Sequence, residues 1–352
     1  MRVALVASPF ISVPPERYGG TELFVATLAE ALVALGVEVD VYANGESTVR
    51  ATLHSRYAKQ EWPLPSETSG LTKEVDHIAW AVDDAEANCD IIHVSSAVAV
   101  PFSRFSSRPF VYTLHHPVIA AFTDLYERHP NVAYTAISHH QASLHASLRP
   151  HVIHHGLDLS QYQFSEEKQP YVVFLGRICP IKGTHNAIEI AKRAGIPLKI
   201  AGEIQPVFQD YFETEIRPHL DGRNVEYVGE ADMALKNELL GHAAALLFPI
   251  EWEEPFGLAM IEPMACGTPV IAFPGGAVEE VIDDGISGRV CHGIDEAVTV
   301  LQRETFEPKA VRQCAETRFS ADVMARQYYR LYSGLLKSKP FRPILDPEET
   351  AA

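Results

Sequence analysis

Two glutamates eight positions apart are the first residues of this chain whose spacing suggests chemistry. The run is Glu254-Pro-Phe-Gly-Leu-Ala-Met-Ile-Glu262, directly after an apolar stretch that is typical of a strand. Pro255 suits the first turn of a helix, so the corner predicts a strand that turns into a helix. Because eight helical residues turn through about 800°, the two carboxylates cannot share one helical stripe. We expect them to hold different parts of one elongated ligand, a polyol with a phosphate between its ends. The alternative is two solvated charges.

The corner between these glutamates also offers backbone donors. Phe256, Gly257 and Leu258 present N–H groups at the expected helix N-terminus, where the helix dipole favours an anion or a hydroxyl oxygen. Gly257 has no side chain, so a ligand can approach the backbone closely. This corner therefore predicts a binding site for the anionic or hydroxyl groups of a ligand.

Two cations stand together at a second position, in Gly176-Arg177-Ile-Cys-Pro-Ile-Lys182-Gly183. An apolar strand is expected to end at Gly176, and a helix to begin near Gly183. Fixed positive charges at the carboxyl end of a strand are suited to a departing diphosphate, on which negative charge develops. The alternative is a solvated arginine and lysine on a loop.

The first half of the chain offers weaker signals. Gly19 and Gly20 precede a helix that Thr21 can cap, and adjacent glycines form a small nest of N–H groups. The glycine fingerprint of dinucleotide-binding folds is absent, which disfavours a nicotinamide-dependent dehydrogenase. Thr-Leu-His115-His116 ends another expected strand, which places one of these histidines at the ligand edge of a sheet.

Strands and helices alternate along the chain, which predicts an α/β protein with two doubly wound Rossmann-like domains facing across a cleft. Strands are expected at 2–8, 37–43, 91–94, 110–114, 134–137 and 151–155, and again at 171–176, 198–202, 225–229, 245–249, 269–273 and 288–291. The expected divisions are a first domain at 1–158, a second at 159–320, a helix at 321–336 that packs back toward the first domain, and a flexible tail at 337–352.

Composition narrows the function. The chain has 352 residues, more than one hydrophobic core usually serves, and a formal charge of −17, which argues against nucleic acid as a partner. No apolar run is long enough to span a bilayer and no signal peptide is recognisable, so we expect a cytoplasmic protein with no transmembrane segment. Its five cysteines form no Cys-x-x-Cys pair and are expected to be reduced core residues. Its 16 histidines show no metal-ligand spacing, so we expect no metal cofactor.

The run from Glu254 to Glu262, followed by Met-Ala-Cys-Gly-Thr-Pro-Val, resembles the signature of family-4 retaining glycosyltransferases, which have the GT-B fold. The resemblance implies that Glu254 contacts hydroxyls of the donor sugar and that Glu262 binds the ribose of the nucleotide. Pro263 departs from the family pattern, and a proline there should kink or loosen the helix that aims Glu262. Residues 154–158 resemble the hinge of the family, and 275–280 resemble its last loop and helix, in which Glu280 is expected to be structural.

The same resemblance assigns the remaining candidates. Arg177 and Lys182 match the diphosphate clamp, and the loop with Gly19 and Gly20 matches one that closes over the phosphate and sugar of the donor. His115 matches a histidine near the primary hydroxyl of the donor sugar and the acceptor. The role of His116 stays open.

The resemblance implies a metal-independent hexosyltransferase that uses a nucleoside-diphosphate sugar, most commonly a UDP-sugar. Its acceptor would be a hydroxyl group of a small molecule or saccharide. The product would belong to glycan, glycolipid or natural-product glycoside biosynthesis. With no carboxylate placed to form a covalent intermediate, attack from the face of the leaving group is the favoured mechanism. Two alternatives are a nucleotide-sugar epimerase of the same architecture and a non-catalytic nucleotide-sugar-binding protein.

Overall fold

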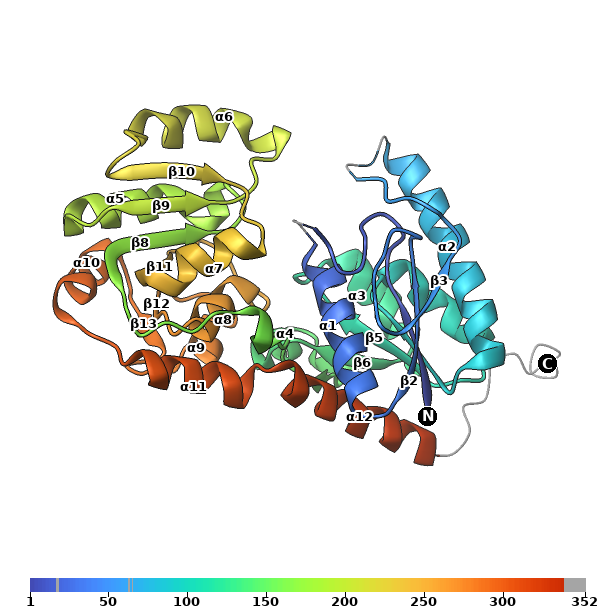
Figure 1. The fold of residues 1–352 in the computed structure, drawn as a ribbon. Coiled ribbons are helices and arrows are strands. Elements are labelled where there is room, and N and C mark those ends of the chain that lie inside the picture. The colour runs from blue at the N-terminus through green and yellow to red at the C-terminus, as the bar shows by residue number, and fades with distance from the viewer. Residues whose placement is uncertain (17–18, 63, 65, 339–352) are drawn as a thin grey trace. The chain divides into compact units, whose positions relative to one another are not determined.

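The computed structural model describes residues 1–16, 19–62, 64 and 66–338. Contacts within the chain divide it into two compact units, one of residues 1–156 together with the segment from 321 onward, and one of residues 157–320. Each unit is an α/β body with one parallel sheet (Figure 1), which confirms the predicted fold class. The predicted tail lies outside the described residues, except for Lys337 at the end of the last helix and Ser338 after it.

The sheet of the first unit has seven parallel strands in the order β3-β2-β1-β4-β5-β6-β7. Its helices cover both faces, as expected for strands that are buried on both sides. The strands are β1 (Arg2–Val6), β2 (Glu38–Ala43), β3 (Thr52–Ser55), β4 (Ile91–Val94), β5 (Phe110–Leu114), β6 (Ala133–Ala136) and β7 (His151–Val152), and the helices are α1 (Gly20–Ala34), α2 (Glu67–Asn88), η1 (Ala97–Phe105), α3 (Ala120–Glu127), α4 (His139–Leu144), η2 (Ala146–Leu148) and α12 (Ala321–Lys337).

The sheet of the second unit has six parallel strands in the order β10-β9-β8-β11-β12-β13. The strands are β8 (Gln169–Leu175), β9 (Leu198–Ala201), β10 (Val225–Gly229), β11 (Ala243–Phe248), β12 (Val270–Ala272) and β13 (Gly288–Val290). The α-helices are α5 (Thr184–Ala194), α6 (Gln209–Tyr211), α7 (Met233–His242), α8 (Leu258–Ala265), α9 (Val278–Val281), α10 (Ile294–Arg303) and α11 (Pro308–Arg318); the short helical turns are η3 (Leu159–Gln161), η4 (Pro180–Lys182), η5 (Pro206–Phe208), η6 (Phe212–Ile216) and η7 (Arg217–His219).

In each sheet the chain order reverses once, between β1 and β4 in the first unit and between β8 and β11 in the second. At such a reversal the loops that leave neighbouring strands diverge to opposite faces of the sheet, and the space between them is where doubly wound folds bind ligands. The reversal between β8 and β11 therefore marks the expected ligand edge of the second unit.

The last helix, α12, packs against α1 on the first unit, as the sequence predicted. Tyr328 and Tyr332 are fully buried on it, and their hydroxyls bond to Thr113 Oγ1 at 2.9 Å and to His93 Nδ1 at 2.7 Å. Because α1 packs against both the sheet and α12, residues on most of the circumference of α1 are buried, including Phe24. The helix that follows the second unit thus completes the core of the first.

Several local predictions are corrected by the structure. The strand expected at 151–155 ends at Val152, and β3 was missed because Thr-Leu-His-Ser has only one strongly apolar residue. Thr21 does not cap α1, because the helix already begins at Gly20 and Gly19 occupies the cap position. All five cysteines are buried and unpaired, as expected.

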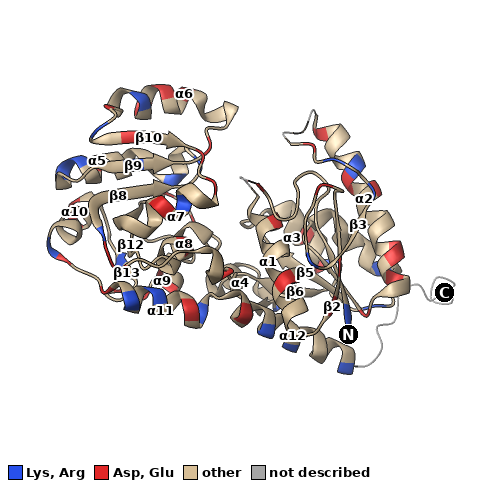
Figure 2. Ribbon diagram, in the orientation of Figure 1, with Lys and Arg blue, Asp and Glu red and all other residues tan. Residues whose placement is uncertain are grey.

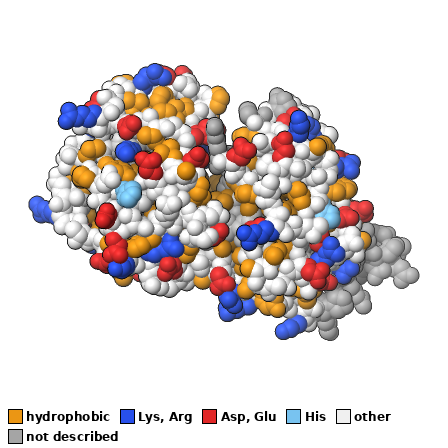
Figure 3. Space-filling view, in the orientation of Figure 1, with side chains coloured by type: hydrophobic (Ala, Val, Ile, Leu, Met, Phe, Trp, Pro, Cys, Tyr) orange, Lys and Arg blue, Asp and Glu red, His pale blue; other side chains and the backbone are white. Residues whose placement is uncertain are grey.

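Charged residues of both signs are interleaved on the helices of both units (Figure 2), and the space-filling view shows the same mixture on this face of each (Figure 3). Among the described residues, no helix is long and apolar enough to cross a membrane.

The buried His93 predicts a loss of stability in acid. Burial lowers the pKa of His93 to about 3, below the ordinary value of an unfolded histidine, so below pH ~6.5 the unfolded chain binds a proton that the folded chain refuses. We expect His93→Gln to be less stable than the wild type at neutral pH, with a difference in unfolding free energy that narrows by about 1.4 kcal/mol per pH unit toward pH 4.5. Urea titrations at several pH values measure this, and a constant difference would contradict it.

Candidate functional site

Two loops meet at the reversal point of the second sheet and carry most of the predicted residues. One follows β8 and holds Arg177 and Lys182, and the other follows β11 and holds Glu254. Because β8 and β11 are parallel neighbours, both loops leave the same edge of the sheet. The structure therefore brings together two groups that are 72 positions apart in sequence.

A glycine contact locks these loops together. Gly183 has φ of +72°, and a β-carbon there would lie 1.8 Å from the carbonyl oxygen of Pro249. The backbone N–H of Glu251 also donates to the carbonyl of Ile181 at 2.8 Å. In addition, the carboxylate of Glu251 accepts a hydrogen bond from Asn186 on the first turn of α5 at 2.8 Å. The two loops therefore form one rigid edge.

Lys182 forms an ion pair with Glu254, and both side chains are largely buried, at 14% and 9% exposure. Trp252 supports the pair from two sides. Its indole N–H donates to Glu254 Oε2 at 3.1 Å, and its ring lies 4.5 Å from the Lys182 ammonium. Sequence reasoning missed Trp252, although it stands only two positions before the glutamate that opens the motif.

Arg177 is the second predicted cation on this edge. It follows Gly176 at the end of β8 and is half-buried. Within the described ranges its guanidinium makes no hydrogen bond or ion pair, in contrast to Lys182. The edge thus holds one cation engaged with a carboxylate and one cation that is available to an anion.

The Pro-Phe-Gly corner differs from the prediction in one respect. Pro255 does not enter the helix, because α8 begins at Leu258 and Gly257, with φ of +87°, is its cap residue. The side chain of Phe256 is buried and packs edge-to-face against Phe319 at 5.8 Å, so it anchors the corner in the core. The N–H of Met260 already donates to the carbonyl of Gly257 at 2.9 Å, so the N–H groups that the helix start offers are those of Leu258 and Ala259.

The glycine loop after β12 supports the backbone of Glu254. A β-carbon on Gly276 would lie 2.1 Å from the carbonyl oxygen of Glu254, and the N–H of Ala277 donates to that oxygen at 2.8 Å. The N–H of Gly276 donates to the carboxylate of Glu253 at 2.6 Å. The loop of residues 275–277 therefore fixes the backbone of Glu254, which is a structural role.

Glu262 lies inside α8 with its side chain only 5% exposed. Lys236 of α7 pairs with it at 2.7 Å, and Tyr162 donates to the same carboxylate oxygen at 3.0 Å. The helix continues through Pro263 to Ala265, so this proline does not end it. The missing N–H removes a single bond near the end of a short helix, and Glu262 is oriented by groups from outside α8.

In the first unit, Gly19 and Gly20 lie at the start of α1, after the loop that leaves β1. Gly19 has φ of +146°, and its missing side chain faces Pro15 and the carboxylate of Glu22. Glu22 is 7% exposed, and burial raises its pKa to about 7. Tyr18, the residue before this pair, lies outside the described residues.

His115 lies at the end of β5, as predicted, among aromatic rings. Its ring stacks on His155 with centroids 5.5 Å apart and meets Phe24 edge-on at 4.8 Å. Burial, with a smaller contribution from His155, holds the pKa of His115 well below its usual range, and its Nε2 is buried without a hydrogen bond in the described part of the chain. His115 is therefore a neutral hydrogen-bonding group.

His116 turns to another side and joins a local network. Its Nε2 bonds to the hydroxyl of Tyr126 at 2.8 Å, and its Nδ1 bonds to the carbonyl of Pro117 at 2.7 Å. Burial lowers the pKa of His116 as well. Both of its ring nitrogens are therefore engaged in contacts within the first unit at the end of β5.

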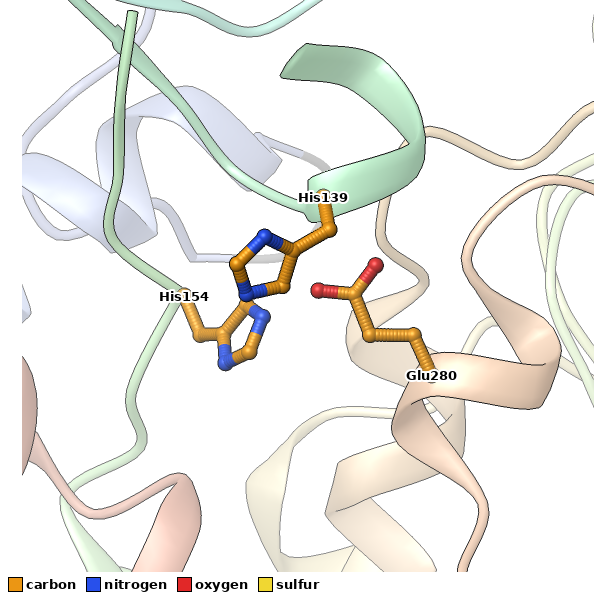
Figure 4. Close-up of side chains that lie close together, drawn as sticks. All are labelled: His139, His154 and Glu280. Carbon is orange, nitrogen blue, oxygen red and sulfur yellow. The ribbon is translucent and has the colours of Figure 1, made fainter. Parts of the chain in front are cut away.

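Two further histidines lie close together within the first unit. His139 begins α4 and His154 follows β7, and their rings meet edge-to-face with centroids 6.0 Å apart (Figure 4). Glu280, drawn in the same figure, comes from α9 of the second unit, and its backbone carbonyl accepts a hydrogen bond from Arg318.

Both halves of the chain match families of known enzymes. Residues 158–300 match the family described as glycosyl transferases group 1, and residues 18–161 match glycosyltransferase family 4. Together the two matches include the loops that follow β5, β8 and β11.

Individual proteins agree with these matches. Glycogen synthase of Mycobacterium tuberculosis is 28% identical over 217 residues, which is 55% of this chain and 52% of that enzyme. The chain thus matches about half the length of this relative. Among solved structures, AviGT4, a glycosyltransferase involved in avilamycin A biosynthesis, superposes with a TM-score of 0.71 at 25% identity, covering 97% of this chain and 99% of its own. The Anabaena protein HepE, solved with UDP-glucose, shares the fold with a TM-score of 0.71 at 18% identity, covering 95% and 100%.

The contact at Gly183 can be tested against a matched glycine. Gly183 and Gly195 have nearly equal φ values of +72° and +71°, but no atom lies within 4 Å of a β-carbon added at Gly195. We expect Gly195→Ala to cost about 1 kcal/mol, from backbone strain alone. Gly183→Ala should cost at least ~2 kcal/mol more, because the Pro249 carbonyl must move.

Urea unfolding of the two variants measures this difference. Equal losses of stability would show that the two loops do not constrain each other.

Proposed function

Because this chain belongs to the family-4 glycosyltransferases of GT-B fold, we propose that it transfers a sugar from a nucleoside-diphosphate sugar to a hydroxyl acceptor, with retention of the anomeric configuration. The observation that carries the proposal is the contact between Lys182 and Glu254 at the reversal point of the second sheet. It combines a cation for a diphosphate with a carboxylate for sugar hydroxyls in one place.

Binding of the donor breaks the ion pair between Lys182 and Glu254 and gives each side chain a new partner. Lys182 and Glu254 neutralise each other in the free protein, and their burial makes an uncompensated charge costly. A diphosphate supplies the negative charge that Lys182 needs, and sugar hydroxyls donate to Glu254. Trp252 continues to hold Glu254 by its indole N–H during this exchange.

Arg177 supplies the second positive charge for the diphosphate. Its guanidinium is half-buried and unengaged within the described residues, so it can bind a phosphate oxygen without breaking another contact. The backbone N–H groups at the start of α8, from the cap residue Gly257 and from Leu258, contact the sugar or its phosphate. These groups stabilise the charge that develops on the leaving diphosphate, so the reaction needs no metal or other cofactor.

The first unit supplies the acceptor side. His115 is neutral at working pH and offers a buried nitrogen to a hydroxyl group of the donor sugar or the acceptor. We assign Gly19 and Gly20, at the start of α1, to the binding of the donor phosphate through their backbone N–H groups. We assign UDP as the nucleotide, because HepE, which shares the fold, was solved with UDP-glucose. The acceptor is a small molecule or saccharide, and we place the reaction in the cytoplasm.

The reaction class is tested by following nucleotide release. We expect a UDP-sugar to release UDP slowly alone and at least about tenfold faster with a sugar or polyol acceptor, in the presence of EDTA as well as in its absence. Release that an acceptor does not change favours the epimerase, and binding without release favours a sugar-nucleotide-binding protein. Loss of activity in EDTA would contradict metal independence. The anomeric configuration of the product, read by NMR, tests retention.

The cation clamp is tested by replacing its members. Arg177→Ala should lower turnover about 10²–10³-fold, because a charge that stabilises the transition state is lost. For Lys182 we use the double variant Lys182→Met with Glu254→Gln, which leaves no buried charge unpaired, and expect a loss at least as large. Lys199→Ala is the control. Lys199 lies on β9, and its ammonium contacts the ring of Tyr171 on β8, away from both loops. Near wild-type turnover of Arg177→Ala refutes the clamp.

A further inference from the structure

The second buried carboxylate of the donor unit has an unusual arrangement of partners. Lys236 donates to Glu262 Oε1 at 2.7 Å, and the hydroxyl of Tyr162 donates to the same oxygen at 3.0 Å. Within the described part of the chain, no donor binds the other oxygen, Oε2. One oxygen of the carboxylate is thus doubly engaged and the other is available.

Such an arrangement fixes the orientation of the carboxylate. The terminal torsion of a glutamate is soft, so a free carboxylate samples a broad range of orientations. Two donors on one oxygen restrict that range and direct the second oxygen away from them. Lys236 also compensates a carboxylate that is 5% exposed, which would otherwise carry an unpaired buried charge.

The two donors come from elements that are themselves held in place. Lys236 lies near the start of α7, where Asp232 caps the helix by accepting from the Leu235 N–H at 2.9 Å. Tyr162 follows the turn at Leu159–Gln161, and its hydroxyl stays protonated because burial and the nearby Glu262 raise its pKa. Both donors are therefore held in place, and the Tyr162 hydroxyl keeps its proton at working pH.

We propose that Lys236 and Tyr162 are positioning residues that aim Glu262 Oε2 at the vicinal hydroxyls of the donor ribose. This inference rests on the proposed function and deepens it, because it names the residues that make the site prefer a ribonucleotide. Lys236 acts through the carboxylate and does not bind the diphosphate. A ligand without ribose hydroxyls leaves Oε2 unsatisfied and binds more weakly.

The test compares a nucleotide with its analogue that lacks the two hydroxyls. UDP, ADP and GDP are screened by calorimetry, and the tightest binder is compared with its 2′,3′-dideoxy form. We expect the wild type to favour the ribonucleotide by at least about 30-fold in Kd, as sites built to hydrogen-bond a ligand hydroxyl do. In Lys236→Met this ratio should fall to within about threefold of unity, and Lys236→Arg should restore part of it.

Lys168→Met is the matched control. Lys168 is also a half-buried lysine of this unit, but its ammonium bonds to the carbonyl of Gly241 and the hydroxyl of Thr268, each at 2.8 Å. Among the residues that the structure describes, it has no carboxylate partner. Its replacement should lower the melting temperature and leave the ribose preference unchanged. This control separates a general loss of stability from a loss of the orientation of Glu262.

Each outcome bears on a distinct claim. If no nucleoside diphosphate binds the wild type, the proposed function fails. If the wild type discriminates and Lys236→Met keeps the full ratio, this inference is overturned. Should Lys236→Met fail to fold, Tyr162→Phe decides, because it removes only one hydroxyl: a ratio reduced by at least about threefold supports the inference, and an unchanged ratio overturns it.

Discussion

The contact between the backbone of Gly183 and the carbonyl of Pro249 is the constraint on which the candidate site of the second unit depends. Lys182 directly precedes this glycine, and Glu254 follows the proline by five positions. Because a β-carbon cannot fit between the two loops, the cation and the carboxylate are brought within an ion-pair distance by backbone packing rather than by their own attraction. Parallel pairing of β8 and β11 places both loops at one edge, and the close contact then fixes their separation.

The same physical principle recurs at both buried carboxylates of the second unit, Glu254 and Glu262. Glu254 is held by Lys182 and an indole N–H, and Glu262 by Lys236 and a phenolic hydroxyl. Each carboxylate is almost fully buried, and each is compensated by one lysine, since an unpaired charge in that environment would be very costly. The lysines differ in what they leave available. In the proposed function Lys182 exchanges its carboxylate for a phosphate, whereas Lys236 stays paired with one oxygen of Glu262 and leaves the other oxygen for a ligand.

The sequence predicted the two parallel α/β units and the packing of the last helix onto the first, because these follow from hydrophobic periodicity along the chain. It did not predict the partners. Lys236 and Trp252 carry no spacing signal, since their contacts depend on how α7 and the β11 loop pack against α8 and the β8 loop. Thr21 and Pro255 were misassigned because each helix begins at a glycine cap with positive φ, a choice that close packing makes and propensity does not show.

The two units differ in the electrostatic character of their candidate groups, and this difference fits the proposed roles of the two units. In the first unit, burial disfavours the charged forms of the ionisable groups. The pKa of His115 lies well below its usual range, and the pKa of Glu22 is raised to about 7. The second unit instead carries charged pairs and an unengaged arginine. Neutral hydrogen-bonding groups suit a hydroxyl, whose charge changes little on binding, and fixed cations suit a diphosphate, on which charge accumulates as the bond to the sugar breaks.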